Sequence, residues 1–124
     1  MEASIVSRSM SSFYGLPLDH VAAKVCCADT AGVEFEVEGD VWLRLERELS
    51  GSRFTGRVCI VYESGYQAGL VLVDGVVFGA YLEAPDGGVS MGEQAVTVVE
   101  ALWGPATVRF WPASLEELEA AEQP

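Results

Sequence analysis

Residues 69–80 read GLVLVDGVVFGA, in which two almost continuously apolar runs flank Asp74-Gly75. An Asp-Gly pair tolerates the positive φ angles of a two-residue turn whose twist matches that of the flanking strands. The stretch therefore predicts a tight β-hairpin, in which Asp74 serves as a turn residue and not as a catalytic carboxylate. Because both arms are apolar on both faces, we expect this hairpin to be central in a sheet that is covered on each side.

Three further segments show the period-2 alternation that is typical of strands, and they span residues 33–38, 58–63 and 107–111. In the first, apolar residues alternate with three glutamates, and acidic side chains along one face discourage pairing with another copy of the chain. In the last, Val108 and Phe110 share one face, while Arg109 and Trp111 share the other.

Helix signals lie between these strands. Asp40 is a predicted N-cap for a helix over residues 40–50. Ser90 with Glu93 forms a predicted capping box for a second helix that Gly104-Pro105 ends, and Ser114 with Glu117 forms another. A short helix is expected near residues 21–26, before a turn at residues 28–32.

These elements predict an α+β fold, a mainly antiparallel sheet with a central Asp-Gly hairpin, packed against two or three helices. At 124 residues the chain is most simply one domain. Its expected parts are a lead-in over residues 1–15, a core over residues 33–111 and an acidic C-terminal helix over residues 114–124.

The charge is strongly acidic, with 19 Asp and Glu against 7 Lys and Arg, for a formal net charge of −12. Nucleic-acid binding relies on clustered basic side chains, and the same electrostatics governs binding to anionic lipid surfaces. We therefore expect neither nucleic acid nor a membrane as a partner. The acidity suits solubility, or attraction to a basic partner protein.

The three cysteines, Cys26, Cys27 and Cys59, are odd in number and two are adjacent. This pattern does not predict a secreted disulfide framework, and we expect them to be small buried hydrophobes. Residues 1–12 lack the features of a secretory signal, and no apolar run is long enough to span a bilayer, so a cytoplasmic location is expected.

No catalytic constellation is predicted. The single histidine, His20, argues against a two-histidine zinc site, and no cofactor is expected. The chain has neither a phosphate-loop nor a dinucleotide-binding glycine motif, and we expect no nucleophile elbow. The sequence thus predicts a protein that is not an enzyme.

Three stretches together carry a resemblance to a known family, and they are Phe54-Thr55-Gly56, residues 69–80 and Gly92-Glu93-Gln94-Ala95-Val96. Over about residues 33–111 the chain resembles the PATAN-type domain and related uncharacterised archaeal proteins. The resemblance implies a noncatalytic domain of signalling or regulatory contexts that acts through protein contacts. It implies no catalytic residues for this chain.

Aromatic residues supply the candidate contact sites, because aromatic side chains dominate interface hot spots. We expect Trp42 and Trp103 in the core, and Trp111, Tyr66 and Tyr81 at a partner-binding surface. The leading hypothesis is a protein-interaction module, with a homodimer as one form of it, that docks through the outer face of its sheet or through its helix pair.

The alternative hypothesis is a small-ligand sensor for an anion or a nucleotide. Its pocket would lie between the loop over residues 65–69, the loop over residues 85–88 and the helix expected to start at Ser90. Free backbone N–H groups at that helix start would hold the anion.

Overall fold

The structure is a computed structural model, and it describes residues 18–26 and 33–122. The lead-in over residues 1–15, the turn at residues 28–32 and Cys27 lie outside the described residues.

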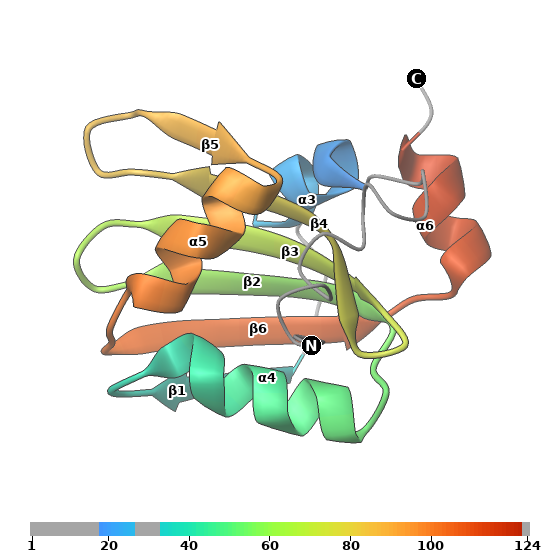
Figure 1. Cartoon of the computed structure of the whole chain (residues 1–124), viewed down its shortest axis with the longest axis horizontal. Helices are drawn as coiled ribbons and strands as arrows, with labels where there is room; N and C mark the ends of the chain where they lie inside the picture. The colour runs from blue at the N-terminus through green and yellow to red at the C-terminus, as the bar shows by residue number, and fades with distance from the viewer. Residues whose placement is uncertain (1–17, 27–32, 123–124) are drawn as a thin grey trace, which may run out of the picture.

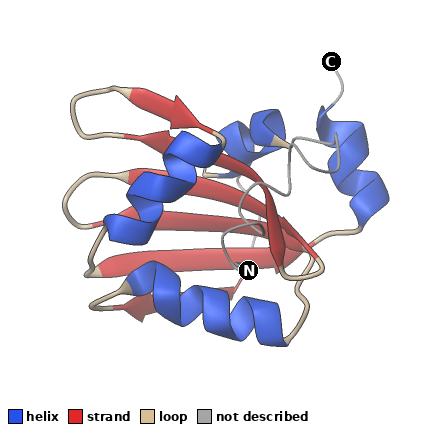
Figure 2. Cartoon of the chain, in the orientation of Figure 1, coloured by secondary structure: helices blue, strands red, loops and turns tan. Residues whose placement is uncertain are grey.

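A single antiparallel sheet organises the described part of the chain (Figures 1 and 2). Its six strands follow the order β1-β6-β2-β3-β4-β5. Their bounds are β1 Val33–Val37, β2 Gly56–Tyr62, β3 Gln67–Val73, β4 Val76–Glu83, β5 Val89–Met91 and β6 Ala106–Pro112. The predicted strands and the antiparallel α+β class are confirmed.

Helices cover both faces of this sheet (Figure 1). One face carries α4 (Val41–Gly51) and α5 (Glu93–Ala101), and the other carries α3 (Asp19–Val25) and α6 (Leu115–Glu122). The described residues thus contain four helices, where the sequence predicted two or three.

The Asp-Gly hairpin is confirmed as the turn between β3 and β4. Asp74 has φ 55° and Gly75 has φ 83°, the positive values that this turn requires. Arg53 donates two hydrogen bonds to the Asp74 carboxylate, at 2.9 and 2.8 Å, and this pairing holds the pKa of Asp74 below its ordinary value. Asp74 is therefore a turn residue held by its neighbour.

The hairpin is apolar on both faces because its alternate side chains enter two different cores. Leu70 and Leu72 of β3 pack with α4 and α5, whereas Val71 between them packs with α3 and α6. With β2 on one side and β4 on the other, β3 is an interior strand, as predicted.

Two glycines allow α3 to lie directly on the sheet. A Cβ atom at Gly69 would collide with the carbonyl oxygen of Ala22, and one at Gly79 would collide with that of Leu18. Leu18 also donates its N–H to the carbonyl of Phe78, at 2.9 Å. Any larger residue at either glycine position would push the helix away from the sheet.

The caps of two helices are confirmed. The N–H of Leu43 donates to the Asp40 carboxylate at 3.2 Å at the start of α4. At the start of α6, Ser114 and Glu117 form the predicted capping box, in which each backbone N–H donates to the other residue's side chain, at 2.8 and 3.1 Å.

The predicted capping box of Ser90 and Glu93 is wrong. Ser90 lies inside β5, opposite Leu82 of β4, because the edge of β4 offers backbone partners to this segment. The chain then turns at Gly92, whose φ is 65°, and α5 begins at Glu93 without a side-chain cap. Pairing with the sheet edge has replaced a local cap.

Tyr62 is buried in the core between the sheet, α4 and α5. Its hydroxyl has no hydrogen-bond partner in the described part of the chain. Burial, with a smaller contribution from the Asp40 carboxylate, raises the pKa of Tyr62 above its ordinary value. A buried hydroxyl without a partner costs about 1–3 kcal/mol. We therefore expect Tyr62→Phe to raise the free energy of unfolding by about 1 kcal/mol at pH 7.

The pH dependence gives a second readout of the same substitution. An unfolded chain ionises its tyrosines near pH 10, whereas folded Tyr62 stays neutral to higher pH. Below about pH 10 Tyr62 is neutral in both states, and the full free energy of unfolding is present. As the pH rises further, ionisation favours the unfolded chain and the free energy of unfolding falls. Urea denaturation at pH 7 and 11 should show a smaller alkaline loss in Tyr62→Phe than in the wild type or in Tyr66→Phe. Equal losses in all three would contradict the expectation.

Candidate functional site

The candidate site is a groove between α4 and the β1 edge of the sheet, with a volume of about 580 Å³. This size lies within the usual range of about 300–1,000 Å³ for ligand pockets. Its apolar lining comes from β1, α4, β6 and the segment before β2, and comprises Phe35, Val37, Leu45, Leu49, Phe54 and Phe110. Its polar lining comprises Glu36, Glu38, Arg44, Glu48 and Ser52.

Three phenylalanines form one wall of the groove. The ring of Phe110 meets Phe35 edge-to-face with centroids 5.8 Å apart, and meets Phe54 in the same way at 5.6 Å. This arrangement is the one that aromatic quadrupoles favour, so the rings support one another. All three are only partly buried, which leaves aromatic surface for an occupant.

The opposite wall is the amphipathic helix α4. Leu45 and Leu49 are buried on its sheet-facing side, one turn apart, and Glu48 is exposed beside them. Figure 1 shows α4 running along the edge of the sheet where β6 and β1 lie. The helix therefore forms one wall of the groove.

The charged groups of the groove are mainly acidic. The lining includes three glutamates, Glu36, Glu38 and Glu48, against the single arginine Arg44. Glu36 belongs to it through the β1 backbone, because its side chain alternates to the opposite face of the strand. An anionic or phosphorylated ligand would meet repulsion here, whereas a cationic or neutral apolar group would be favoured.

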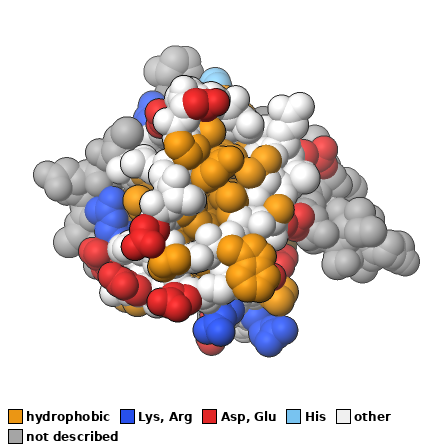
Figure 3. Space-filling model, turned by 90° about the vertical axis from the view of Figure 1, so that its left-hand side faces the viewer, with side chains coloured by type: hydrophobic (Ala, Val, Ile, Leu, Met, Phe, Trp, Pro, Cys, Tyr) orange, Lys and Arg blue, Asp and Glu red, His pale blue; other side chains and the backbone are white. Residues whose placement is uncertain are grey.

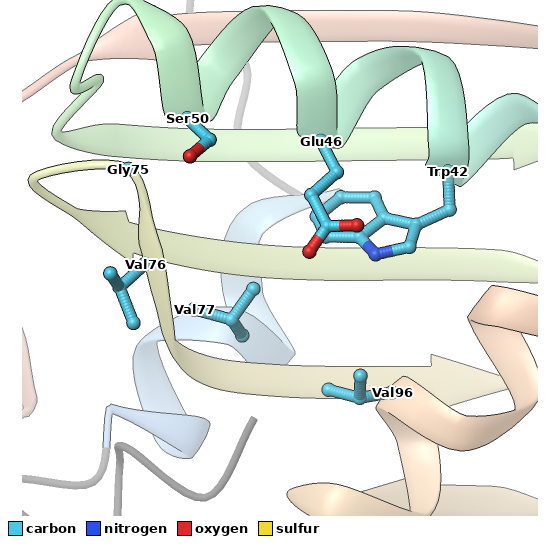
Figure 4. A pocket seen from close by; sticks show the side chains of 7 residues that line it. All are labelled: Trp42, Glu46, Ser50, Gly75, Val76, Val77 and Val96. Carbon is cyan, nitrogen blue, oxygen red and sulfur yellow. The ribbon is translucent and has the colours of Figure 1, made fainter. Parts of the chain in front are cut away.

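A smaller cavity of about 80 Å³ lies between α4, the β3–β4 turn and α5 (Figure 4). In Figure 4 the carboxylate of Glu46 and the indole of Trp42 face the same space, with Val77 and Val96 opposite. Such a space holds a few water molecules, and it is too small for a ligand of metabolite size.

The region predicted for an anion site is occupied by the chain's own groups. The two loops touch, since a side chain at Gly65 would come 3.0 Å from Pro85. At the start of α5, the Asp19 carboxylate lies beside Gly92 and accepts a hydrogen bond from the N–H of Ala80 at 2.9 Å. A carboxylate next to a helix N-terminus favours the helix and repels an external anion.

The structure does not bring the three predicted partner-binding residues together. Trp111 is only 6% exposed, because α3 and α6 cover its face of the sheet, so its predicted role at a partner surface is wrong. Tyr66 and Tyr81 are half-buried and pack against different cores, on opposite faces of the sheet. They cannot belong to one contact patch.

Trp103 is a second aromatic residue that the sequence placed wrongly. It was expected in the core, but it is 65% exposed. The helix α5 ends at Ala101 and Leu102 is extended, so Trp103 leaves the buried helix face and lies over the turn at Gly39. Figure 3 shows hydrophobic side chains gathered at the end of the molecule that carries the α5–β6 connection. Gly104-Pro105 was the sequence signal for this early helix end.

A Gly-x-Ser-x-Gly pattern at residues 88–92 also escaped the sequence prediction. In hydrolases this pattern exposes the serine on a sharp turn between a strand and a helix, within reach of a histidine. Here Ser90 lies within β5, on the same face as Leu82, which packs with the α4 and α5 core. His20, the only histidine, is on α3 across the sheet. The geometry is not that of a nucleophile elbow.

The structure joins Cys26 and Cys59 in a disulfide that links α3 to β2, with their Cα atoms 5.2 Å apart. The sequence did not predict this bond, whereas Cys59 is buried as predicted. The bond depends on the tertiary packing of α3 across β2 and β3. This packing brings Cys26, at the C-terminal end of α3, next to Cys59.

No protein-family model, curated protein or solved structure matches this chain. The resemblance to the PATAN-type domain therefore stays a prediction. No helix in the described part of the chain is long and apolar enough to cross a membrane.

Proposed function

We propose that this protein is a noncatalytic interaction module that holds an apolar segment of a basic partner protein in the groove between α4 and β1. The observation that carries the proposal is the groove itself, with an aromatic wall and an acidic polar lining. A few residues supply most of the energy in protein contacts, aromatic side chains are common among them, and charge complementarity contributes to the choice of partner. The predicted regulatory role is part of the same proposal and is supported by the resemblance over residues 33–111.

The electrostatics of the described residues supports a noncatalytic role. The carboxyl groups whose pKa is lowered, Asp74 and Glu117, serve a β-turn and a helix cap. Neither lines the groove. Perturbed carboxyl groups gathered in a cleft would have indicated acid–base chemistry.

The test is selection from a random peptide library, followed by affinity measurement with the enriched peptides. We expect enriched sequences to combine apolar with basic residues. Glu48→Trp places a bulky ring in the groove from an exposed position of α4, and it should weaken binding at least tenfold. Glu116→Trp makes the same change on α6, across the sheet, and should leave binding unchanged.

The control separates groove binding from general charge attraction. Equal affinity for the two variants would show that peptides bind elsewhere on the acidic surface. An absence of any enriched sequence would also remove the proposal.

A second candidate function is the sensing of a small ligand, which the groove volume of about 580 Å³ favours. The acidic lining points to a neutral or cationic apolar compound in place of the predicted anion or nucleotide. A thermal-shift screen in which such compounds stabilise the wild type but not Glu48→Trp would support this function over a protein partner.

A cytoplasmic location is also a proposal. The acidic composition is compatible with it, but disulfides are rare in cytosolic proteins, so the Cys26–Cys59 disulfide weighs against it. Alkylation of free thiols at the moment of cell lysis decides the matter, because a cytosolic protein would have both cysteines reduced.

A further inference from the structure

The strand β1 forms one edge of the sheet, and its outward side is open within residues 18–26 and 33–122. The direction of its backbone groups follows from the neighbouring strands. The N–H of Tyr62 donates to Tyr66 at 2.9 Å and the N–H of Glu63 donates to Pro105, also at 2.9 Å. Since backbone groups alternate along a strand, odd-numbered residues of β2 therefore bond to β6.

The alternation carries across β6 to the edge. Thr107 and Arg109 of β6 lie opposite odd-numbered residues of β2, and they therefore direct their backbone groups to β2. Val108 and Phe110, which alternate with them, direct their backbone groups to β1. Their partners are Phe35 and Val33. The backbone N–H and C=O groups of the residues between, Glu34 and Glu36, point away from the sheet, where another strand would find them.

The side chains of β1 differ between the two faces. Val33, Phe35 and Val37 lie on the face of the sheet that α4 covers, because their partners on β6 belong to the core under that helix. Phe35 and Val37 also line the groove. Glu34 and Glu36 project to the opposite face. A strand added beyond β1 would extend both faces, because residues that lie opposite each other across a ladder share a face.

The chemistry of such a strand can be deduced from these two faces. Residues opposite Val33, Phe35 and Val37 would turn toward the groove beneath α4 and should be apolar. Residues opposite Glu34 and Glu36 would meet carboxylates and should be Lys or Arg, because opposite charges across a ladder stabilise pairing. The edge thus specifies a segment in which apolar and basic residues alternate.

We propose that β1 is a docking edge for an extended segment of a basic partner protein, which adds a strand beyond β1 and inserts its apolar side chains into the groove under α4. The proposal rests on the proposed function and specifies the form of the partner. Strand addition is a common mode of peptide recognition, in which backbone bonds give affinity and alternate side chains give specificity. A second copy of this chain fits poorly, because two β1 edges would bring their glutamates together.

The probe is a labelled heptapeptide of alternating Val and Lys, compared with a peptide of the same composition whose Val and Lys residues form two blocks. The alternating peptide should bind at least tenfold more tightly. Binding should slow hydrogen exchange at the amides of Glu34 and Glu36 by tenfold or more, since these amides would acquire acceptors.

Edge variants test the geometry. Glu36→Pro removes an outward N–H without removing a bond to β6, and it should weaken the alternating peptide at least tenfold. The matched control is Val89→Pro on β5, the opposite edge, where Ser90 faces β4 and Val89 also directs its N–H outward. This variant should bind normally. Glu34→Lys with Glu36→Lys keeps the backbone intact and should also weaken binding at least tenfold.

The outcomes separate this inference from the proposed function. Equal affinity for the two peptides, or normal binding to Glu36→Pro, would overturn strand addition. If Glu48→Trp still abolished binding of library peptides, the groove would remain a docking site for another conformation, such as a helix. Slow exchange at Glu34 and Glu36 without peptide would show that a segment of this chain or a second copy already pairs there, and would also overturn the inference.

Discussion

Replacing Trp42 with alanine should lower the free energy of unfolding by about 3–5 kcal/mol, the usual cost of deleting a buried large side chain. Trp42 is 3% exposed and belongs to the core between the sheet, α4 and α5. It also borders the 80 Å³ cavity, so the space left by its indole would join an existing void. The cost of such a substitution rises with the volume of the cavity that is left, which places the expected loss at the high end.

Urea denaturation followed by circular dichroism measures this loss, and Trp103→Ala is its matched control. Trp103 is 65% exposed, and surface substitutions usually change stability by about 0.5 kcal/mol or less. The sequence predicted both tryptophans in the core, so the pair directly compares that expectation with the structure. Similar losses for both variants would show that Trp103 is buried in solution.

The elements that sequence reasoning predicted correctly depend on short-range physics. The turn at Asp74-Gly75 requires only positive φ angles, and the Asp40 and Ser114 caps require only neighbouring backbone donors. The apolar arms of the hairpin indicate a strand covered on both faces whatever covers it. Local signals therefore defined the class of the fold and most of its strands.

The errors arise where a partner distant in sequence decides the outcome. Ser90 and Glu93 have the residues of a capping box, but β4 offers its free edge to residues 89–91 and the segment pairs with it instead. Trp103 has the spacing of a helix face, but α5 ends two residues earlier. Neither competing interaction is visible in a local window of sequence.

The candidate site was hidden for the same reason. Phe35, Phe54 and Phe110 come from three separate segments, and only the placement of β6 between β1 and β2 brings their rings together. The acidic alternation of β1 was predicted, and that it discourages self-pairing stays a prediction. Its complement, an edge suited to a basic strand, becomes evident only once β1 is known to be the edge.

Removal of the Cys26–Cys59 disulfide should lower the free energy of unfolding by about 3–4 kcal/mol. The bond joins residues separated by 33 positions, and closing a loop of this length restricts the unfolded chain by roughly that amount. The native contacts of α3 with the sheet do not depend on the bond, because Leu18 bonds to Phe78 and the helix backbone lies against Gly69 and Gly79. The effect should therefore appear as lower stability of an intact fold.

The double variant Cys26→Ala with Cys59→Ala measures the loss by urea denaturation, and Cys27→Ala is the control that should match the wild type. Dithiothreitol should destabilise the wild type to the level of the double variant and have no effect on the double variant itself. A loss in Cys27→Ala equal to that in the double variant would assign the bond to Cys27. Resistance of the wild type to the reductant, together with full stability of the double variant, would show that the two sulfurs are packed together without a bond. In that case the cysteines would behave as the small hydrophobes that the sequence predicted, and the objection to a cytoplasmic location would disappear with the bond.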